Sequence, residues 1–222
     1  MISLTAIVKA LFITFEGTEG SGKSTQVSLL AQALRAIGRT VRTLREPGGT
    51  PIGEEIRHTL KHSTVNQAMT PETELLLMNA SRAQLVREII RPALAAGEII
   101  LCDRFYDSTT AYQGYGRMLD LKMVGDIIAV AVGETLPDLT LLLLVPQTLS
   151  EERRLARQPS LPLAIKRDRF EEADRTFFDR VATGYQAIAA NEPRRVKSIP
   201  ASGPVEAVAA NIWRTVEPLL KG

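Results

Sequence analysis

Short apolar runs alternate with longer segments of mixed polarity along most of the chain. Apolar runs of about 4–8 residues that are rich in β-branched residues, leucine or phenylalanine are typical of strands. Residues 139–145 are apolar at almost every position, as expected for a parallel strand that is buried on both faces. The pattern therefore predicts five strands, over residues 11–16, 40–45, 99–103, 139–145 and 195–199.

The segments between these runs carry apolar residues at helical spacing. Gly38 and Gly97 stand where two of the segments should end, since glycine readily adopts the conformation that closes a helix. Pro71 suits the first turn of a helix, and Thr70 before it is a candidate N-cap. The predicted helices span residues 23–37, 52–61, 71–96, 121–132, 148–157, 169–190 and 205–220.

The alternation of strands and helices predicts one α/β domain over residues 1–222. Because helices separate the strands, we expect an open, five-stranded parallel sheet with helices on both faces. Ligands of such sheets bind beyond the carboxyl ends of the strands, where residues 17–24, 45–47 and 103–104 are predicted to lie. Residues 1–10 are predicted to be a short extension and not a cleaved leader, because the apolar run continues directly into the first strand.

The composition excludes several classes of protein. The chain is 45% hydrophobic and 23% charged, which is ordinary for a soluble domain, and no apolar run is long enough to span a membrane. A formal net charge of +2 argues against a general nucleic-acid-binding surface. Cys102 is the single cysteine, so no internal disulfide can form, and we expect a reducing compartment, the cytoplasm. Cys102 lies in an apolar run and is predicted to be a core residue.

Residues 17–24 match the pattern G-x-x-x-x-G-K-[ST] of a phosphate-binding P-loop. Its glycines let successive backbone N–H groups point at phosphate oxygens, and the helix that follows adds its positive end. Lys23 can reach the β- and γ-phosphates of a nucleotide, and the Ser24 hydroxyl can bind Mg²⁺. The predicted nucleotide-binding residues are Gly17, Thr18, Glu19, Gly20, Ser21, Gly22, Lys23, Ser24 and Thr25.

Asp103 and Arg104 close a predicted strand that is far from the P-loop in sequence. In a parallel sheet the two strand ends can be neighbours. An aspartate at that place can hold Mg²⁺ through water, and an arginine can bind a phosphate with two hydrogen bonds. The simpler interpretation is a helix cap followed by a solvated arginine. The position at a strand end beside a P-loop favours the functional interpretation.

Four segments of the chain resemble those of a known family. Residues 101–113 (LCDRFYDSTTAYQ) resemble the signature of thymidylate kinases, and residues 45–51 (REPGGTP) resemble a second block of that family. Residues 15–26 resemble the P-loop of the family, and residues 168–171 resemble the segment after its lid. The resemblance runs from about residue 11 to the C-terminus.

The resemblance implies a P-loop nucleoside-monophosphate-kinase-like fold with a short lid at about residues 150–170. It implies transfer of a phosphoryl group from ATP to dTMP with Mg²⁺, and a homodimer to which residues 71–96 could contribute. Another nucleoside or nucleotide kinase on the same scaffold is the first alternative. A nucleotide-dependent switch without turnover is the second, but it would need neither acceptor-side arginines nor a basic lid.

The resemblance also implies roles for residues near the phosphate and sugar of dTMP. Arg45 and Arg104 would bind the dTMP phosphate, and Glu19 would face the sugar 3′-hydroxyl or the metal shell beside it. Tyr112 would pack where a 2′-hydroxyl would sit, which disfavours ribonucleotides. The Glu46–Pro47 peptide bond would be cis. The acceptor is already an anion, so the reaction would need no strong general base.

One residue on the base side departs from the pattern of the family. Arg82 would hydrogen-bond a thymine carbonyl, and the aromatic ring that usually stacks on thymine is replaced by Met78. A thioether can pack on a base face but lacks the ring–ring attraction, about 1 kcal/mol. Met78 also fits a core stripe with Leu75 and Leu76, so both interpretations remain open. The implied dTMP site comprises Glu19, Arg45, Pro47, Met78, Arg82, Arg104, Ser108, Thr109, Tyr112 and Gln113.

Basic residues gather around a segment that prolines interrupt, residues 159–162; they are Arg153, Arg154, Arg157, Lys166, Arg167 and Arg169. Charge alone fits a solvated surface equally well, and the balanced net charge disfavours a nucleic-acid patch. Because the P-loop has no arginine at Thr18 or Ser21, the resemblance implies the class of thymidylate kinases whose lid carries the catalytic arginine. The predicted catalytic residues are Lys23, Arg45, Arg104, Arg153 and Arg157.

Overall fold

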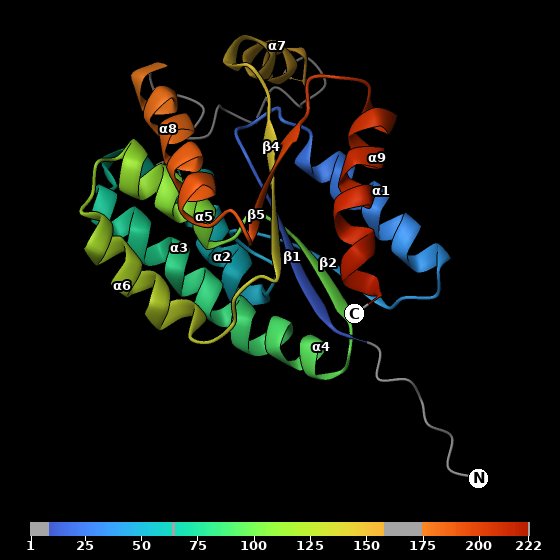
Figure 1. Ribbon diagram of the computed structural model, residues 1–222. Coiled ribbons are helices and arrows are strands. Elements are labelled where there is room, and N and C mark those ends of the chain that lie inside the picture. The colour runs from blue at the N-terminus through green and yellow to red at the C-terminus, as the bar shows by residue number, and fades with distance from the viewer. Residues whose placement is uncertain (1–8, 64, 158–174, 222) are drawn as a thin grey trace.

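A central sheet organises the computed structural model, which describes residues 9–63, 65–157 and 175–221 (Figure 1). Five parallel strands lie in the order β2-β3-β1-β4-β5. They are β1 (Leu11–Glu16), β2 (Val41–Arg45), β3 (Ile99–Asp103), β4 (Leu139–Leu144) and β5 (Val196–Pro200). The predicted five-stranded parallel sheet is confirmed, and only the boundaries of β2, β4 and β5 differ from the prediction, by one residue each.

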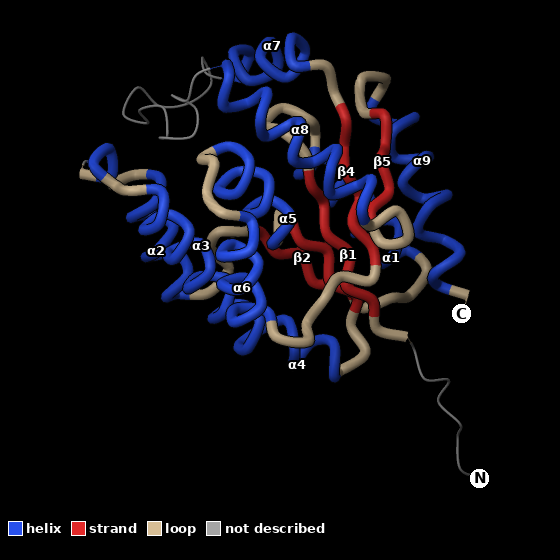
Figure 2. The backbone as a smooth tube through the Cα atoms, turned by 60° about the vertical axis from the view of Figure 1, so that its left-hand side comes forward, coloured by secondary structure: helices blue, strands red, loops and turns tan. Residues whose placement is uncertain are grey.

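Helices cover both faces of the sheet (Figures 1 and 2). On one face, α1 (Lys23–Ala36) and α9 (Val205–Val216) lie side by side. On the other face, α3 (Pro71–Leu85) and α8 (Arg175–Asn191) belong to separate groups of helices that pack on different strands. The remaining helices are α2 (Pro51–Lys61), α4 (Arg91–Ala95), α5 (Tyr106–Thr109), α6 (Leu121–Val132) and α7 (Gln147–Arg157).

Several helical regions differ from the sequence prediction. The helix predicted over residues 205–220 consists of α9 and a 3-10 helix at Glu217–Leu220, and the short 3-10 helix at Asn66–Ala68 was not predicted. The helix predicted over residues 71–96 consists of α3, a π-helical segment at Val86–Ile90, and α4. The prediction missed α5 and the π-helical segment that follows it, Thr110–Gly116. The predicted beginning of a helix at residue 169 lies outside the described residues, as do residues 1–8 of the extension predicted at residues 1–10.

The central strands bury side chains on both faces. On β1, Leu11, Ile13 and Phe15 join the apolar cluster that contains residues of α1 and α9, whereas Phe12 joins the cluster formed with α3 and α6. Cys102 of β3 is fully buried in this second cluster, as predicted, and burial raises the pKa of its thiol. Because the central strands are largely apolar on both faces, the charged side chains that they position lie at their carboxyl ends.

The parallel register brings the three polar strand ends together. Arg45 of β2 and Phe15 of β1 are both register partners of Asp103 in β3. Backbone hydrogen bonds continue the pairing beyond the strands, from Glu46 N–H to Asp103 O at 3.0 Å and from Arg104 N–H to Phe15 O at 2.9 Å. The P-loop and the segments after β2 and β3 therefore lie side by side, as predicted.

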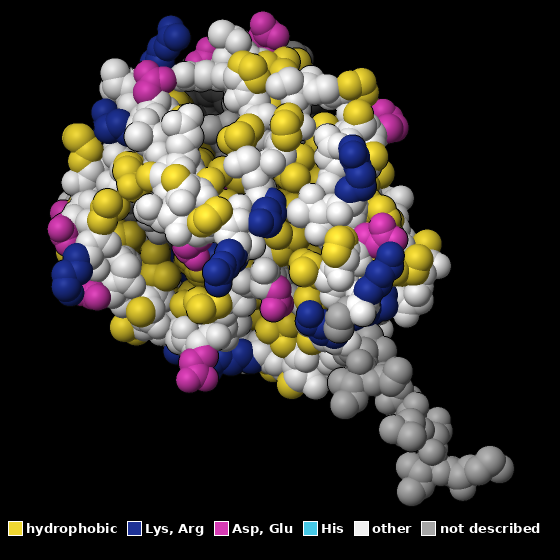
Figure 3. All heavy atoms as spheres, viewed as in Figure 1, with side chains coloured by type: hydrophobic (Ala, Val, Ile, Leu, Met, Phe, Trp, Pro, Cys, Tyr) yellow, Lys and Arg dark blue, Asp and Glu magenta, His cyan; other side chains and the backbone are white. Residues whose placement is uncertain are grey.

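The molecular surface carries charges of both signs. On the face seen in Figure 3, Lys and Arg side chains are interspersed with Asp and Glu side chains. In the part of the chain that the structure describes, every helix is too short or too polar to cross a membrane.

Candidate active site

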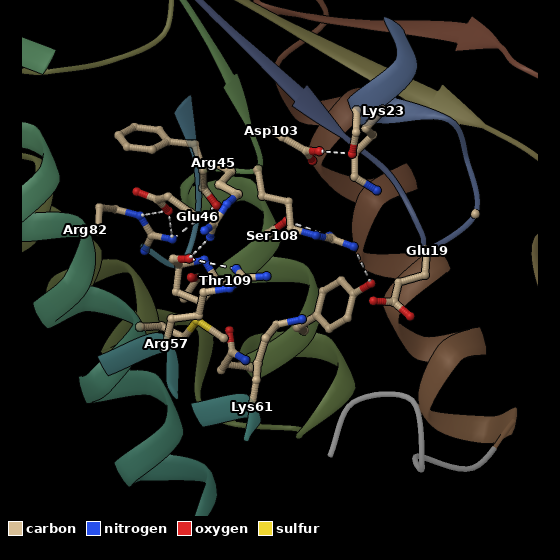
Figure 4. Close-up of a pocket in the computed structure, with 18 of the residues that line it drawn as sticks. Glu19, Lys23, Arg45, Glu46, Arg57, Lys61, Arg82, Asp103, Ser108 and Thr109 are labelled. Carbon is tan, nitrogen blue, oxygen red and sulfur yellow. Dashed lines mark hydrogen bonds and ion pairs between the residues drawn. The ribbon is translucent and has the colours of Figure 1, made fainter. Parts of the chain in front are cut away.

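A cavity of about 380 Å³ opens at the carboxyl ends of β1, β2 and β3 (Figure 4). The predicted site residues on its walls are Glu19, Gly20, Gly22, Lys23, Ser24, Arg45, Pro47, Met78, Arg82, Asp103, Arg104, Ser108, Thr109, Tyr112 and Gln113. Four further lining residues were not predicted as site residues: Glu46, Arg57, Lys61 and Phe105. Among the described residues that were predicted for the site, those off the cavity wall are Gly17, Thr18, Ser21, Thr25 and Arg153.

Glycines give the P-loop its shape. Gly17, Gly20 and Gly22 have φ angles of 133°, 76° and 91°. Residues that carry a Cβ atom rarely adopt such angles. A Cβ atom on Gly17 would lie 2.5 Å from the carbonyl oxygen of Leu143, and one on Gly20 would lie 2.6 Å from that of Ser150. The loop therefore fits closely between β4 and α7.

The Lys23 side chain folds back over the P-loop. Its ammonium group donates to the carbonyl oxygens of Gly17 and Thr18 at 3.0 and 2.9 Å, and to the Ser21 hydroxyl at 3.4 Å. Burial, reinforced by the positive charge of Arg104, lowers the pKa of Lys23 to about 7. A phosphate in the loop would raise this pKa again, because its negative charge favours the ammonium form.

Ser24 and Asp103 meet at the junction between the P-loop helix and β3. The Ser24 hydroxyl donates to Asp103 Oδ2 at 2.6 Å. The described residues contain no group of three or more His, Cys, Asp or Glu side chains that could hold a metal ion. Mg²⁺ usually takes one or two protein oxygens and completes its octahedral shell with phosphate and water. The hydroxyl and carboxylate present here fit Mg²⁺ that arrives with nucleotide phosphates.

Arg104 is held by neutral partners. It has a φ angle of 70°, and its guanidinium donates to the hydroxyls of Ser108, Tyr185 and Tyr112 at 3.0, 3.2 and 3.2 Å. The guanidinium also lies 5.0 Å from the centre of the Tyr112 ring. Its hydrogen-bond partners are uncharged, while the nearby charges of Glu16 and Asp103 also act on it, so the guanidinium can still bind an anionic ligand.

Arg45 has an anionic but exposed partner. Its guanidinium donates to Glu54 at 3.0 Å, and the two side chains are 49% and 43% exposed. Exposed ion pairs of this kind are weak, so a phosphate can compete with Glu54 for Arg45. Arg57 donates to the carbonyl oxygen of Pro47 at 2.8 Å, and the Glu46–Pro47 bond is cis, as the resemblance implied. Figure 4 shows Lys23 on one side of the cavity and Arg57 on the other.

A buried carboxylate at the end of β1 was not among the predicted site residues. Glu16 Oε1 accepts hydrogen bonds from the backbone N–H groups of Phe105 and Ser108 at 2.7 and 3.2 Å. Its Oε2 accepts from the hydroxyls of Ser108 and Tyr185 at 2.5 and 3.0 Å. Burial raises the pKa of Glu16 to about 7, and the nearby charge of Asp107 adds to the rise. A glutamate that ends a strand otherwise apolar except at Thr14 was the available signal, since such a group needs buried partners.

Arg82 is buried and makes most of its hydrogen bonds within the protein. It donates to Glu46 Oε2 at 2.9 and 2.6 Å, to Asn79 Oδ1 at 2.8 Å and to the carbonyl oxygen of Phe105 at 3.2 Å. These bonds use four of the five N–H groups of a guanidinium and leave one, on Nη1, for a ligand. The contact to thymine that the resemblance implies would therefore depend on this single N–H group.

Uncharged side chains line another part of the cavity wall. Met78 lines the cavity and also packs against the apolar cluster that contains Tyr112 and Phe177, so features of both sequence interpretations are present. Thr109 and Gln113 are almost completely buried and reach the same wall.

The first turns of α7 pack against the P-loop. The Ser150 hydroxyl donates to the carbonyl oxygen of Glu19, and Arg153 donates to the carbonyl oxygens of Gly20 and Ala201 at 3.4 and 3.2 Å. Arg153 is thus placed beside the P-loop, as a catalytic lid arginine would be. The side chains of Arg154 and Arg157, and the whole of residues 158–174 with Lys166, Arg167 and Arg169, lie outside the described part of the chain.

A comparison with known families covers the residues that line this cavity. The family model for thymidylate kinase matches residues 15–212, which include the whole wall of the cavity. The chain belongs to the thymidylate kinase family. Membership confirms the resemblance carried by the four sequence blocks and the prediction that the protein is an enzyme, a kinase.

Similar thymidylate kinases match almost the full chain. That of Chlorobium luteolum is 48% identical over 216 residues, 95% of this chain and 99% of the relative. That of Solidesulfovibrio magneticus is 46% identical over 210 residues, 95% of this chain and 100% of the relative. A crystal structure of thymidylate kinase from Ehrlichia chaffeensis superposes with a TM-score of 0.75 at 31% identity, covering 93% of this chain and 98% of that one. The predicted P-loop nucleoside-monophosphate-kinase-like fold is therefore confirmed.

Proposed function

We propose that this member of the thymidylate kinase family transfers the γ-phosphoryl group of ATP to dTMP, giving ADP and dTDP for dTTP synthesis. The observation that carries the proposal is that one cavity joins a P-loop to Arg45, which ends β2, and Arg104, which follows β3. A switch without turnover would use the P-loop but has no need of the arginines. We also propose that residues 1–222 form one domain with a lid at about residues 150–170.

The P-loop side of the cavity would bind ATP. Lys23 would exchange its contacts with the loop carbonyls for oxygens of the β- and γ-phosphates, while backbone N–H groups from Gly17 to Thr25 bind the remaining oxygens. Ser24 and, through water, Asp103 would hold Mg²⁺. When bound, the metal would neutralise phosphate charge during transfer.

The opposite side would bind dTMP. Arg45 and Arg104 would hold its phosphate so that one oxygen attacks the γ-phosphorus as the bond to the β–γ bridging oxygen breaks and ADP leaves. Tyr112 would disfavour a 2′-hydroxyl, and Glu19 would face the 3′-hydroxyl. The phosphate of dTMP is already an anion, so positioning and charge stabilisation would provide the catalysis without a general base.

Arginines of α7 would stabilise the charge that spreads over the transferred group. Arg153 is the better supported of the two candidates, because it already contacts the P-loop at Gly20. The other candidate is Arg157, at the end of α7. An essential arginine in this role accelerates phosphoryl transfer by roughly 10³-fold or more.

An assay of ADP release in the presence and absence of dTMP tests the proposal directly. We expect turnover that depends on dTMP and falls when dUMP, dGMP, UMP or AMP replaces it. A preference for a ribonucleotide would favour another nucleotide kinase on the same scaffold. Hydrolysis of ATP at a rate that no acceptor changes would favour the switch.

Two substitutions separate the donor and acceptor halves of the site. We expect Lys23→Ala and Arg104→Ala each to lower kcat/KM by about 10²-fold or more. Each substitution removes a positive side chain that stabilises the negative charge of the transition state. Lys122→Ala is the matched control, since Lys122 is 83% exposed and pairs with Asp126 on α6. Unchanged acceptor KM and kcat in Arg104→Ala would contradict the proposed acceptor site.

We also propose a cytoplasmic homodimer. The neighbouring helices α3 and α6 carry exposed apolar side chains, with Leu76 56% and Val130 76% exposed. Such side chains are suited to an interface between two copies. The free thiol of Cys102 suits a reducing compartment. Light scattering of the purified protein would test the dimer, and a monomeric mass would contradict it.

A further inference from the structure

A fully buried carboxylate lies behind the base side of the cavity. Glu74, in the first turn of α3, accepts a hydrogen bond from Gln113 Nε2 at 2.8 Å. It also accepts from Arg117 Nε and Nη2 at 3.2 and 3.0 Å. Gln113 lines the cavity, whereas Glu74 and Arg117 are not on its wall. Glu74 therefore reaches the cavity wall through Gln113.

The partner of Gln113 decides which end of its amide faces the cavity. A side-chain amide presents an NH₂ donor at one end and a carbonyl acceptor at the other, whereas an ionised carboxylate can only accept. The amide nitrogen of Gln113 must therefore face Glu74, and the carbonyl oxygen points the other way. Gln113 is 1% exposed, so solvent offers its amide little alternative to these buried partners. The cavity wall consequently presents a hydrogen-bond acceptor at this position.

The arginine on the same wall presents the opposite kind of group. Arg82 has donors only, and the N–H group that its internal partners leave lies on Nη1. A donor together with an acceptor complements the C4 carbonyl and the N3–H group of thymine or uracil. Cytosine reverses both groups, because it has an amino group at C4 and an unprotonated N3.

We propose that Glu74 is a specificity-determining positioning residue, which fixes Gln113 as a hydrogen-bond acceptor and so makes the site reject cytosine nucleotides. The inference rests on the proposed phosphorylation of dTMP and adds to it the group that enforces the choice of base. If Gln113 could turn, its NH₂ group could face the N3 atom of cytosine, and the discrimination would weaken.

The test compares kcat/KM for dTMP with kcat/KM for dCMP in the full-length protein. The wild type is expected to prefer dTMP by about 10²-fold or more, because a site built for a hydrogen bond rejects a base that reverses it. Glu74→Gln keeps the size of the side chain but can donate as well as accept, which lets the Gln113 amide turn. We expect the dTMP/dCMP ratio to fall by at least about tenfold in this variant.

Two further variants separate positioning from a general effect on folding. Arg117→Lys disturbs the same buried pair but keeps a cation beside Glu74 and leaves its contact with Gln113 in place, so the ratio should stay at the wild-type value. In a Gln113→Met background, which already lacks the amide, adding Glu74→Gln should leave the ratio unchanged. If Glu74→Gln does not fold, Glu74→Asp tests the same contact, because the shorter side chain withdraws from Gln113 and the ratio should fall.

The outcomes are distinct. An equal loss toward both nucleotides in Glu74→Gln, or an equal fall of the ratio in the Gln113→Met background, would overturn the role of Glu74. A wild type that does not phosphorylate dTMP would instead contradict the proposed function. A wild type that phosphorylates dTMP and dCMP equally well would overturn the inference while leaving phosphoryl transfer to dTMP intact.

Discussion

At the scale of single residues, Glu16 links the stability of the fold to pH. Its pKa is about 7 in the folded protein, against an ordinary value of 4.5, because burial disfavours the charged form. Between these two pH values the folded protein binds more protons at this group than the unfolded chain does. Stability conferred through Glu16 is therefore present below the lower value and falls as the pH rises toward the upper one.

We expect Glu16→Gln to remove this pH dependence. Between pH 4.5 and 7 the wild type should lose up to about 3 kcal/mol of unfolding free energy relative to the variant, since one pKa unit corresponds to about 1.4 kcal/mol. Urea unfolding followed by circular dichroism at the two pH values measures the difference. Glu98→Gln is the control, because Arg42 lowers the pKa of Glu98 and the same loss should not appear. Parallel pH profiles for wild type and Glu16→Gln would argue against a titrating Glu16.

A second residue-scale prediction concerns Met78. We expect Met78→Phe to lower the KM for dTMP by roughly twofold to tenfold, because aromatic pairs are worth about 0.5–1.5 kcal/mol beyond their buried area. Met78→Leu, which lacks both ring and sulfur, should not lower it. Steady-state kinetics with saturating ATP give both values. A raised KM in Met78→Phe would mean that the cluster with Tyr112 and Phe177 leaves no room for the ring.

The sequence made some site residues predictable and hid others. Lys23 and Asp103 belong to short motifs whose chemistry can be recognised from spacing alone, and both line the cavity. Glu16 and Tyr185 interact across 169 positions of sequence, and Glu74 meets Gln113 across 39. No local pattern specifies such pairs, because they depend on which elements the fold brings together.

At the scale of elements, α5 and the π-helical segment after it are the part of the site that propensity did not predict. Residues 106–116 are rich in Ser, Thr, Tyr and Gly, which favour helices weakly. Tertiary contacts hold them instead. Asp107 accepts two hydrogen bonds from Arg195 at 2.7 and 2.8 Å and one from Thr140 at 3.2 Å. The segment that carries Ser108 and Thr109 is thus anchored by a hydrogen bond to β4 and by an ion pair to Arg195, the residue before β5.

We expect Asp107→Ala to lower the free energy of unfolding by about 1.5–3 kcal/mol, because it removes two charge-assisted hydrogen bonds from the largely buried Arg195, which keeps Glu192 as its other carboxylate partner. Asp126→Ala is the matched control. Asp126 is 67% exposed in its pair with Lys122, and such a pair contributes less than about 0.5 kcal/mol. Chemical denaturation of both variants gives the comparison. A loss in Asp107→Ala no larger than in the control would contradict the anchoring role.

The strands were the elements that the sequence predicted best. Their order in the sheet was the feature that it predicted least. β4 is buried along nearly its whole length, so its apolar run marked it plainly. The order β2-β3-β1-β4-β5 depends on long-range packing that apolar runs do not encode, since any of the buried strands could pair with another. The alternation of strands and helices predicted an open parallel sheet, and the resemblance to a family added the P-loop nucleoside-monophosphate-kinase-like fold.

At the scale of the whole molecule, the proposed homodimer predicts that substitutions on opposite faces of the sheet affect the oligomeric state differently. We expect Val130→Glu, on α6, to shift the mass measured by light scattering toward the monomer, because it places a charge in an apolar interface. Ile37→Glu should leave the mass unchanged. Ile37 is 54% exposed at the end of α1, on the other side of the sheet. A shift in the Ile37 variant alone would place the interface on that side instead.

The burial of Cys102 also has a practical consequence for observing the enzyme at work. It is the single cysteine of the chain and has no exposed surface, so the native protein should not react with thiol reagents. A cysteine introduced in place of the exposed Glu151 on α7 would be the one thiol that a maleimide fluorophore reaches. Fluorescence from that position would report movement of α7 relative to the P-loop as nucleotides bind, without any need to remove a native cysteine first.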